Sequence, residues 1–177
     1  MAGWPASHDF AVIRDATPAD AEAIAAIYNE GIEDRQATFE TELRDGAYFG
    51  DGIAAARVRP FLVYEDAGRV VGWARALVYN WRAAYRGVGE ASLYIARDAR
   101  GRGIGGELLR ALEEACEHAG YWKLIGLIFP ENRASVALFE RAGWRDVGTF
   151  VHHGQLDGEW RDVWLAEKLM GPALRSR

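Results

Sequence analysis

The chain has 177 residues, of which 50% are hydrophobic, and a formal net charge of −5 at neutral pH. This length suffices for a single domain that buries a substantial core without cross-links. The acidic balance argues against broad nucleic-acid binding, because no basic surplus is available to neutralise phosphates.

No apolar run approaches the roughly 18 residues that a membrane-spanning helix needs, so no membrane partner is expected. Residues 1–9 lack the basic segment followed by an apolar one that marks a secretory signal. The single cysteine, Cys116, excludes an internal disulfide and indicates a reducing, cytoplasmic location. We expect one domain at residues 10–170, between tails at 1–9 and 171–177.

The first part of the chain predicts a strand, a helix and a loop. The strand is expected at residues 10–14. Thr17 is a typical N-cap residue, Pro18 suits the first helical position, and the apolar side of the helix continues to Ile32. Residues 33–43 show no clean period, so we expect a loop there that lies over a site.

The next segment predicts a weak helix followed by a hairpin. The helix is expected within residues 44–57, where three glycines lower its propensity. Apolar segments at 61–64 and 70–79 flank a turn at 65–69, which is the pattern of two antiparallel strands.

The second half of the chain alternates strands and helices before a final hairpin. The expected elements are a strand at 91–96, a helix at 104–119, a strand at 123–129, a helix at 132–141 capped by Asn132 and ended by Gly143, and paired strands at 144–152 and 159–169. Cys116 shares a helical face with Leu108 and Leu112, which predicts a buried core thiol. The element order β-α-α-β-β-β-α-β-α-β-β indicates an α/β chain with a mixed α+β sheet.

A glycine-rich turn lies between the expected strand at 91–96 and the following helix. It contains the pattern Arg100-x-x-Gly103-x-Gly105, and glycines let a ligand approach the backbone closely. The free N–H groups at the start of a helix bind phosphate. The same turn also contains the Gly-x-Gly-x-x-Gly pattern of dinucleotide-binding domains. Four residues between strand and turn, and the hairpins at both ends, disfavour that alternative.

The element order and the glycine turn together resemble the GNAT superfamily of N-acetyltransferases over residues 11–170. The resemblance implies a central, mostly antiparallel sheet with splayed parallel strands 4 and 5, flanked by about four helices. It also implies acetyl-coenzyme A as cosubstrate, with its pyrophosphate on the turn and its pantetheine arm along the strand at 91–96. The residues implied to bind it are Leu93, Tyr94, Ile95, Arg100, Gly101, Arg102, Gly103, Ile104, Gly105, Asn132 and Ser135.

Several spaced motifs resemble one group within this superfamily, the phosphinothricin and methionine sulfoximine N-acetyltransferases. The motifs are Tyr28-Asn29-x-x-Ile32, Ala37-Thr38-Phe39-Glu40-Thr41, Ala84-Tyr85 with Glu90 beyond it, Asn132-x-x-Ser135, and Gly158-x-Trp160-x-Asp162-Val163. The segments at 123–132 and 153–160 are most similar to the arsinothricin-acetylating branch. The acceptors of this group are glutamate-like amino acids with an anionic head, and their acetylation is a detoxification.

The resemblance implies direct transfer of the acetyl group to the acceptor amine. Glu90 matches the proposed general base, which removes the ammonium proton. The usual tyrosine that protonates the departing thiolate is replaced by Phe139, so Tyr94, another hydroxyl or water must serve, or the thiolate leaves unassisted. An anionic head needs cationic partners, for which Arg75 and Arg82 are candidates. The expected substrate-binding residues are Tyr28, Phe39, Arg75, Arg82, Tyr85 and Trp160.

Other interpretations of the same residues remain open. A non-catalytic acyl-coenzyme A-binding module agrees with the loss of the tyrosine at Phe139, and an acetyltransferase for a polyamine or a protein N-terminus uses the same fold. His152 and His153 lie near acidic residues, but neighbours on a strand point to opposite faces, so no metal is expected. The resemblance also implies a homodimer with the final hairpin near its interface.

Overall fold

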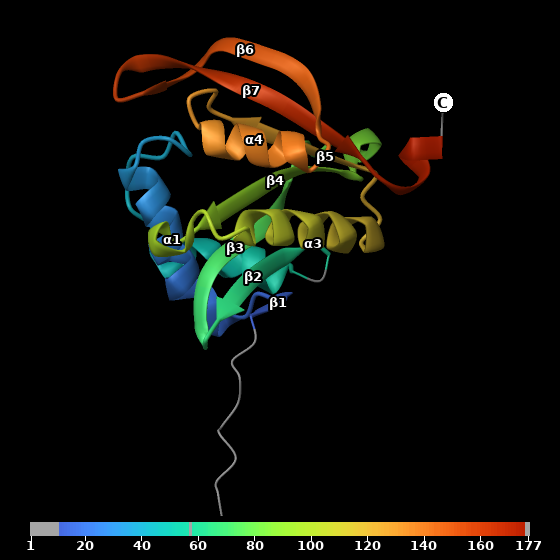
Figure 1. Ribbon diagram of the computed structural model, residues 1–177. Coiled ribbons are helices and arrows are strands. Elements are labelled where there is room, and N and C mark those ends of the chain that lie inside the picture. The colour runs from blue at the N-terminus through green and yellow to red at the C-terminus, as the bar shows by residue number, and fades with distance from the viewer. Residues whose placement is uncertain (1–10, 57, 176–177) are drawn as a thin grey trace, which may run out of the picture.

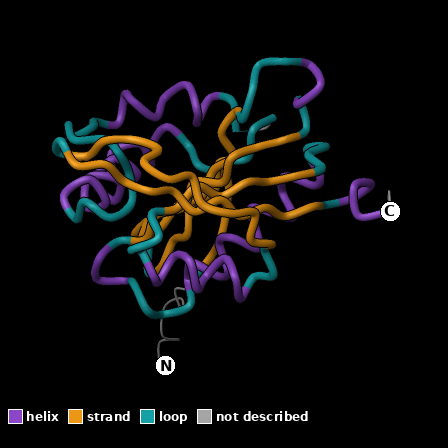
Figure 2. The backbone as a smooth tube through the Cα atoms, turned by 90° about the horizontal axis from the view of Figure 1, so that it is seen from above, coloured by secondary structure: helices purple, strands orange, loops and turns teal. Residues whose placement is uncertain are grey.

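The computed structural model describes residues 11–56 and 58–175, which form one seven-stranded sheet with helices on both faces (Figures 1 and 2). The strand order is β1-β2-β3-β4-β5-β7-β6. The strands are β1 (Val12–Asp15), β2 (Phe61–Asp66), β3 (Arg69–Val78), β4 (Val88–Ile95), β5 (Lys123–Ile128), β6 (Arg145–Leu156) and β7 (Glu159–Leu169). The helices are α1 (Ala21–Glu33), α2 (Gly50–Ala54), α3 (Ile104–His118) and α4 (Arg133–Arg141). The predicted mixed fold and its splayed parallel strands are thus confirmed.

Most element boundaries follow the sequence signals closely. Asn132 caps α4, since its side-chain oxygen accepts a hydrogen bond from the Ser135 amide at 3.1 Å, and Gly143 ends the helix with φ of 76°. The expected helix within 44–57 is a 3-10 turn (Gly46–Phe49) followed by the short α2. Phe10, in the expected first strand, and the tail at 1–9 lie outside the described residues, whereas Gly171–Arg175 forms a 3-10 turn.

Two strands are longer than the sequence predicts. β4 begins at Val88 rather than at residue 91, so Glu90 lies within the strand. The sequence pattern does not show this earlier start, because glycine has a low strand propensity. Gly89 is needed in the strand because a Cβ atom would meet the Tyr121 ring at 2.9 Å. β6 continues to Leu156 beyond a shift in register between Phe150 and Gly154, where His152 adopts φ of 51°. A bulge of this kind breaks the alternation that a sequence pattern relies on.

The two faces of the sheet carry different helices. Trp73 on β3 is fully buried and its indole N–H donates to the Ile24 carbonyl oxygen in α1 at 3.1 Å. Gly72, the preceding residue, faces Leu108 of α3 instead. The α1 face contains an aromatic core around Trp73, and the α3 face contains an aliphatic core with Cys116, which is buried as predicted. Burial raises the pKa of the Cys116 thiol to about 12.

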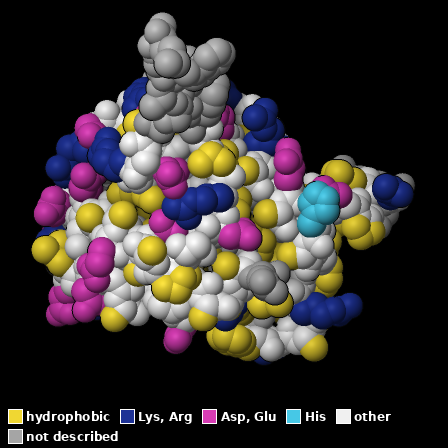
Figure 3. Space-filling view, turned by 90° about the horizontal axis from the view of Figure 1, so that it is seen from below, with side chains coloured by type: hydrophobic (Ala, Val, Ile, Leu, Met, Phe, Trp, Pro, Cys, Tyr) yellow, Lys and Arg dark blue, Asp and Glu magenta, His cyan; other side chains and the backbone are white. Residues whose placement is uncertain are grey.

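The surface carries interspersed charges of both signs. Figure 3 shows acidic and basic side chains mixed over the face seen from below, with no single-sign patch dominating that view. No helix in the described part of the chain is long and apolar enough to cross a membrane.

A charged network ties the first strand to the start of α1. The guanidinium of Arg14 donates to both carboxylate oxygens of Asp20, at 2.8 and 2.9 Å, and to Glu65 on β2 at 2.7 Å. Asp20 is buried and also accepts from the Thr17 amide at 2.7 Å. The hydrogen bond from Arg14 is the main reason why the pKa of Asp20 falls from 3.8 to about 2.

We expect Asp20→Asn to lower the free energy of unfolding at neutral pH by about 2 kcal/mol, because Arg14 loses its charged partner. The folded-state pKa is depressed, so the contribution of Asp20 is complete above pH 4 and disappears as the pH falls toward about 2. Urea denaturation of both proteins between pH 7 and pH 2 measures the difference. Asp15→Asn, at an exposed neighbour, is the control. A difference that does not shrink in acid would contradict this account.

Candidate active site

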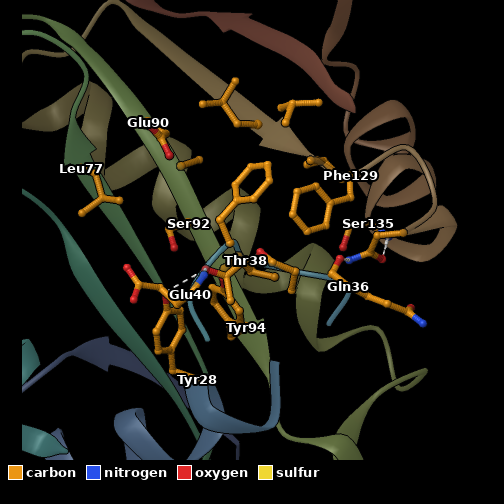
Figure 4. Close-up of a pocket in the computed structure, with 18 of the residues that line it drawn as sticks. Tyr28, Gln36, Thr38, Glu40, Leu77, Glu90, Ser92, Tyr94, Phe129 and Ser135 are labelled. Carbon is orange, nitrogen blue, oxygen red and sulfur yellow. Dashed lines mark hydrogen bonds between the residues drawn. The ribbon is translucent and has the colours of Figure 1, made fainter. Parts of the chain in front are cut away.

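Two cavities lie end to end along β4, one on each side of Tyr94. The first, about 380 Å³, contains Glu90 and is called here the Glu90 cavity (Figure 4). The second, about 690 Å³, is lined by the glycine turn and is called the glycine-turn cavity. Both are lined by Gln36, Ala37, Leu93, Tyr94, Asn132 and Ser135. A single elongated ligand that spans both cavities therefore fits this surface.

The cavities exist because β4 and β5 pair over only three residues. The parallel register covers Val88 with Lys123 through Glu90 with Ile125 and then stops. On its other side β4 stays paired with β3 as far as Ile95. The main-chain groups of residues 91–95 that face β5 thus have no ladder partner among the described strands, and they are available to an extended polar ligand.

The glycine-turn cavity contains the elements of an anion site. Gly101 and Gly103 have φ of 76° and 87°, and no atom lies within 4 Å of a Cβ built on either, so the turn is open. Gly103 is the N-cap of α3, whose first amides have no partner within the helix. These amides and the positive end of the helix suit a pyrophosphate. The predicted coenzyme-binding residues that line this cavity are Leu93, Tyr94, Ile95, Arg100, Gly101, Gly103, Ile104, Gly105, Asn132 and Ser135.

Arg102 is the exception among the predicted coenzyme residues. Its guanidinium forms an ion pair with Asp66 at 2.6 Å and does not line the cavity. Only its main-chain amide lies in the turn. A sequence pattern does not distinguish an arginine that contributes its amide from one that contributes its charge.

Glu90 and Arg75 enter the first cavity from neighbouring strands. Glu90 is opposite Leu77 in the register, and Arg75 is opposite Ser92, so all four side chains share the α1 face of the sheet. Figure 4 shows Glu90, Ser92 and Leu77 around the same space. Burial raises the pKa of Glu90, and the positive charge of Arg75 opposes part of that rise.

Arg75 is a half-buried cation that has no anionic partner among residues 11–56 and 58–175. Its guanidinium carbon lies 5.1 Å from the centre of the Phe49 ring and 5.5 Å from that of Trp73, and its Nε atom makes no hydrogen bond. Burial lowers the pKa of Arg75. Aromatic faces compensate partly for lost hydration, yet a donor at the cavity wall stays available to an anion.

The sequence predicts a loop over the site at 33–43, and the loop that closes the cavities covers 34–43 because Glu33 still belongs to α1. The Tyr94 hydroxyl donates to the Ala37 carbonyl oxygen at 3.0 Å, and the Asn132 amide donates to that of Gln36 at 3.1 Å. Phe39 packs on Phe129 with ring centres 4.7 Å apart. Tyr94 and Asn132 therefore hold the loop as well as lining the cavities.

Two further predicted residues lie where the sequence places them. Tyr28 and Phe39 both line the Glu90 cavity, and the Tyr28 hydroxyl lies 3.1 Å from that of Thr38. Phe139, at the position of the missing tyrosine, is buried and packs closely on Gly126 of β5, where a Cβ would meet its ring at 2.7 Å. Phe139 also lines the Glu90 cavity, but its ring has no hydroxyl group that could donate a proton.

Three predicted substrate residues are not brought to the cavity by this chain. Arg82 and Tyr85 lie in the exposed β3–β4 connection, where Tyr85 packs against Tyr79. Trp160 is 58% exposed and stacks on His152 at 6.0 Å between ring centres. Sequence reasoning also missed cavity residues, namely Gln36, Glu40, Ser92 and His153. Strand alternation from Glu90 would have found Ser92, whereas His153 depends on the bulge in β6.

The histidine pair does not form a metal site with its acidic neighbours. His153 lines the Glu90 cavity and stacks on Phe150, while His152 turns toward Trp160. Across residues 11–56 and 58–175, no three His, Cys, Asp or Glu side chains are grouped closely enough to hold a metal ion.

Comparison with known proteins identifies the family of this chain. Residues 23–144 match the acetyltransferase (GNAT) family. The L-methionine sulfoximine/L-methionine sulfone acetyltransferase of Pseudomonas aeruginosa is 34% identical over 179 residues, covering 92% of this chain and 96% of that protein.

Two solved structures are similar over nearly the whole chain. One is a GNAT phosphinothricin acetyltransferase from Sinorhizobium meliloti in complex with acetyl-CoA, with a TM-score of 0.87, 30% identity, and coverage of 94% of this chain and 92% of that one. The other is the ribosomal-protein-alanine N-acetyltransferase from Brucella melitensis, with a TM-score of 0.86, 35% identity, and coverage of 90% and 99%. The chain belongs to the acetyltransferase (GNAT) family and is an acetyl-CoA-dependent N-acetyltransferase.

Proposed function

We propose that this enzyme acetylates the α-amino group of a small anionic amino acid of the phosphinothricin, methionine sulfoximine or arsinothricin type, in the cytoplasm. One observation carries the proposal: Arg75, a cation without an ion-pair partner in the described part of the chain, shares the Glu90 cavity with a half-buried carboxylate. The cation suits the anionic part of the acceptor, and the carboxylate suits its ammonium group. The Pseudomonas relative, named for methionine sulfoximine and methionine sulfone, and the Sinorhizobium structure, named for phosphinothricin, support this acceptor class.

Glu90 acts as the general base in this proposal. An α-ammonium group must lose a proton before its nitrogen can attack, and a carboxylate with a raised pKa is better matched to that proton than an exposed one. Acetyl-CoA supplies the acetyl group as an activated thioester. Transfer is direct, since the cysteine is buried on the α3 face, away from the cavity.

Tyr94 is the hydroxyl that lines both cavities and is the candidate proton donor to the departing thiolate. Its proton is engaged by the Ala37 carbonyl oxygen, and burial raises its pKa. Donation by Tyr94 thus requires that hydrogen bond to break. Ser135 also lines both cavities and offers a second hydroxyl, and water offers a third route.

A protein N-terminus is the second candidate acceptor, because the Brucella structure is named for that activity. The Glu90 cavity, at about 380 Å³, has the size for a free amino acid, and the packed rings of Phe39 and Phe129 are part of its wall. A polyamine is disfavoured because Arg75 would repel its positive charges.

A homodimer remains part of the proposal. The hairpin of β6 and β7, at the edge of the sheet, exposes apolar side chains that a second copy of the chain would cover. These are Val147, Phe150, Val151 and Trp160, with 43%, 43%, 70% and 58% of their surface exposed.

Replacing Gly103 by alanine should weaken acetyl-CoA binding. Alanine in the left-handed conformation costs about 1 kcal/mol, and relief of that strain displaces the amides of the turn. Gly68→Ala is the matched control, since Gly68 has φ of 75° in the remote β2–β3 turn with equally open surroundings. Both variants should lose similar stability in thermal melts, but only Gly103→Ala should raise KM for acetyl-CoA. Equal KM values would exclude the turn from coenzyme binding.

Replacing Glu90 by glutamine should lower kcat/KM for phosphinothricin by about 100-fold or more, the contribution of a positioned general base. In the wild type, kcat/KM should rise with pH through an apparent pKa above the ordinary glutamate value, because the base works only when deprotonated. That limb should vanish in the variant. Glu114→Gln, at an exposed site on α3, is the control. A variant that keeps the same pH limb would remove Glu90 from the mechanism.

Replacing Arg75 by glutamine should raise KM for phosphinothricin by roughly tenfold to 100-fold, the loss of one charge-assisted hydrogen bond. The variant should still fold, since removal of the Arg75 charge leaves no acidic side chain of the described residues without its ion-pair partner. Arg82→Gln should behave like the wild type because Arg82 is outside the cavity. The wild-type enzyme is also assayed for acetylation of a peptide with an N-terminal alanine and of spermidine. Faster turnover of either than of the amino-acid analogues would reject the proposed acceptor class.

A further inference from the structure

The C-terminal end of α1 carries three acidic residues, Glu30, Glu33 and Asp34. The last turn of a helix is its negative end, so acids there are unfavourable for the helix itself. Two arginines that follow β4, Arg97 and Arg100, offset the negative charge of these acids. Arg97 lies within 3.5 Å of Glu33 and Arg100 within 3.9 Å of Glu30. The acids are therefore placed for contact with the segment that follows β4.

Asp34 is the centre of this contact. Its Oδ1 accepts from the Arg97 guanidinium at 2.8 Å, and its Oδ2 accepts from the Arg100 guanidinium at 2.7 Å. Both hydrogen bonds lower the pKa of Asp34, that from Arg100 most, so the carboxylate is charged at neutral pH. Glu30 adds a third link, because its carboxylate accepts from the Arg97 main-chain amide at 2.6 Å.

Arg100 is fixed at a second point as well. Its Nε donates to the carbonyl oxygen of Ile95, the last residue of β4, at 3.1 Å. The guanidinium thus joins the end of β4, the end of α1 and the first residue of the glycine turn. Its Nε and Nη1 atoms donate to protein oxygens on two sides, and its charge is balanced by Asp34.

We propose that Asp34 is a positioning residue for acetyl-CoA, and that the Arg100 side chain holds the glycine turn in shape rather than binding phosphate by its charge. The amides of the turn remain the groups that contact the pyrophosphate. Asp34 itself lines the glycine-turn cavity, so it is a negative charge beside the expected polyanion. If Asp34 acts only through its charge, its removal should strengthen coenzyme A binding. If it positions the glycine turn, its removal should weaken that binding.

The test is the dissociation constant of coenzyme A for Asp34→Asn, measured by calorimetry on the full chain. Positioning predicts roughly tenfold weaker binding, as expected for the loss of a charge-assisted hydrogen bond. At saturating acetyl-CoA, kcat should stay within about twofold of the wild type, since the Glu90 cavity is intact. Unchanged or tighter binding would overturn the proposal, because neutralising an acid near a polyanion should favour binding if the acid does nothing else.

Asp98→Asn provides the matched control. Asp98 lies between Arg97 and Arg100 in sequence, and it pairs with Arg69 at 2.9 Å on the surface. This variant removes the same charge from the segment that carries Arg97 and Arg100, without removing a partner of either arginine. Its affinity for coenzyme A should equal or slightly exceed that of the wild type. A loss as large as that of Asp34→Asn would show that weaker binding does not depend on the contacts of Asp34 with the two arginines, and would also overturn the proposal.

A double-mutant cycle with Arg100→Gln separates the two roles of the arginine. If Asp34 and Arg100 act as one unit, the double variant should bind coenzyme A about as weakly as either single variant. Additive losses would mean that Arg100 contacts phosphate independently, contrary to the proposal. Wild-type binding of coenzyme A is measured first, so failure of the coenzyme site is distinguished from failure of its positioning. Thermal melts of each variant exclude global unfolding as the cause.

Discussion

The whole site depends on the early end of the parallel pairing between β4 and β5. Three residue pairs hold the strands together, and beyond Glu90 and Ile125 each strand follows its other neighbour, β3 or β7. Phe139 of α4 packs against Gly126 where the separation begins. The divergence creates both cavities, leaves main-chain groups of β4 free for a ligand, and places Glu90 at the last paired position. A continuous ladder would remove the cavities and the free backbone at once.

The Glu90 cavity keeps two opposite charges near each other without closing them into an ion pair. A closed pair would satisfy both groups and leave nothing for an acceptor. Arg75 instead lies against the rings of Phe49, Phe61 and Trp73, which offset part of its lost hydration. Partial burial raises the pKa of Glu90. An amino acid with an anionic head would satisfy both groups together, and this is the physical basis for the proposed acceptor class.

Much of the fold could be predicted because its signals are local. The cap at Asn132, the terminator Gly143 and the open glycines of the turn each need only neighbouring residues to be recognised. The limits of prediction lie where contacts are distant in sequence. Arg75 and Arg82 look equivalent as residue types, yet strand register brings only Arg75 to the cavity. Asp34 gave no sequence signal, because its role depends on two arginines more than 60 residues away. His153 depends on a bulge that alternation does not foresee.

The two cavities use arginine in opposite ways, which would allow an acidic chain to bind the two anionic ligands proposed for it. Around the glycine turn, Arg97, Arg100 and Arg102 are each paired with an acid, so the proposed phosphate site consists of main-chain amides with fixed directions. Such amides bind a pyrophosphate only in one place and orientation, whereas unpaired guanidinium groups would attract any polyanion. In the Glu90 cavity Arg75 has no acidic partner among the described residues, and under the proposal the cavity and its closing loop restrict the ligand by size. Positive charge is thus kept free only where the shape of the cavity already limits what can reach it.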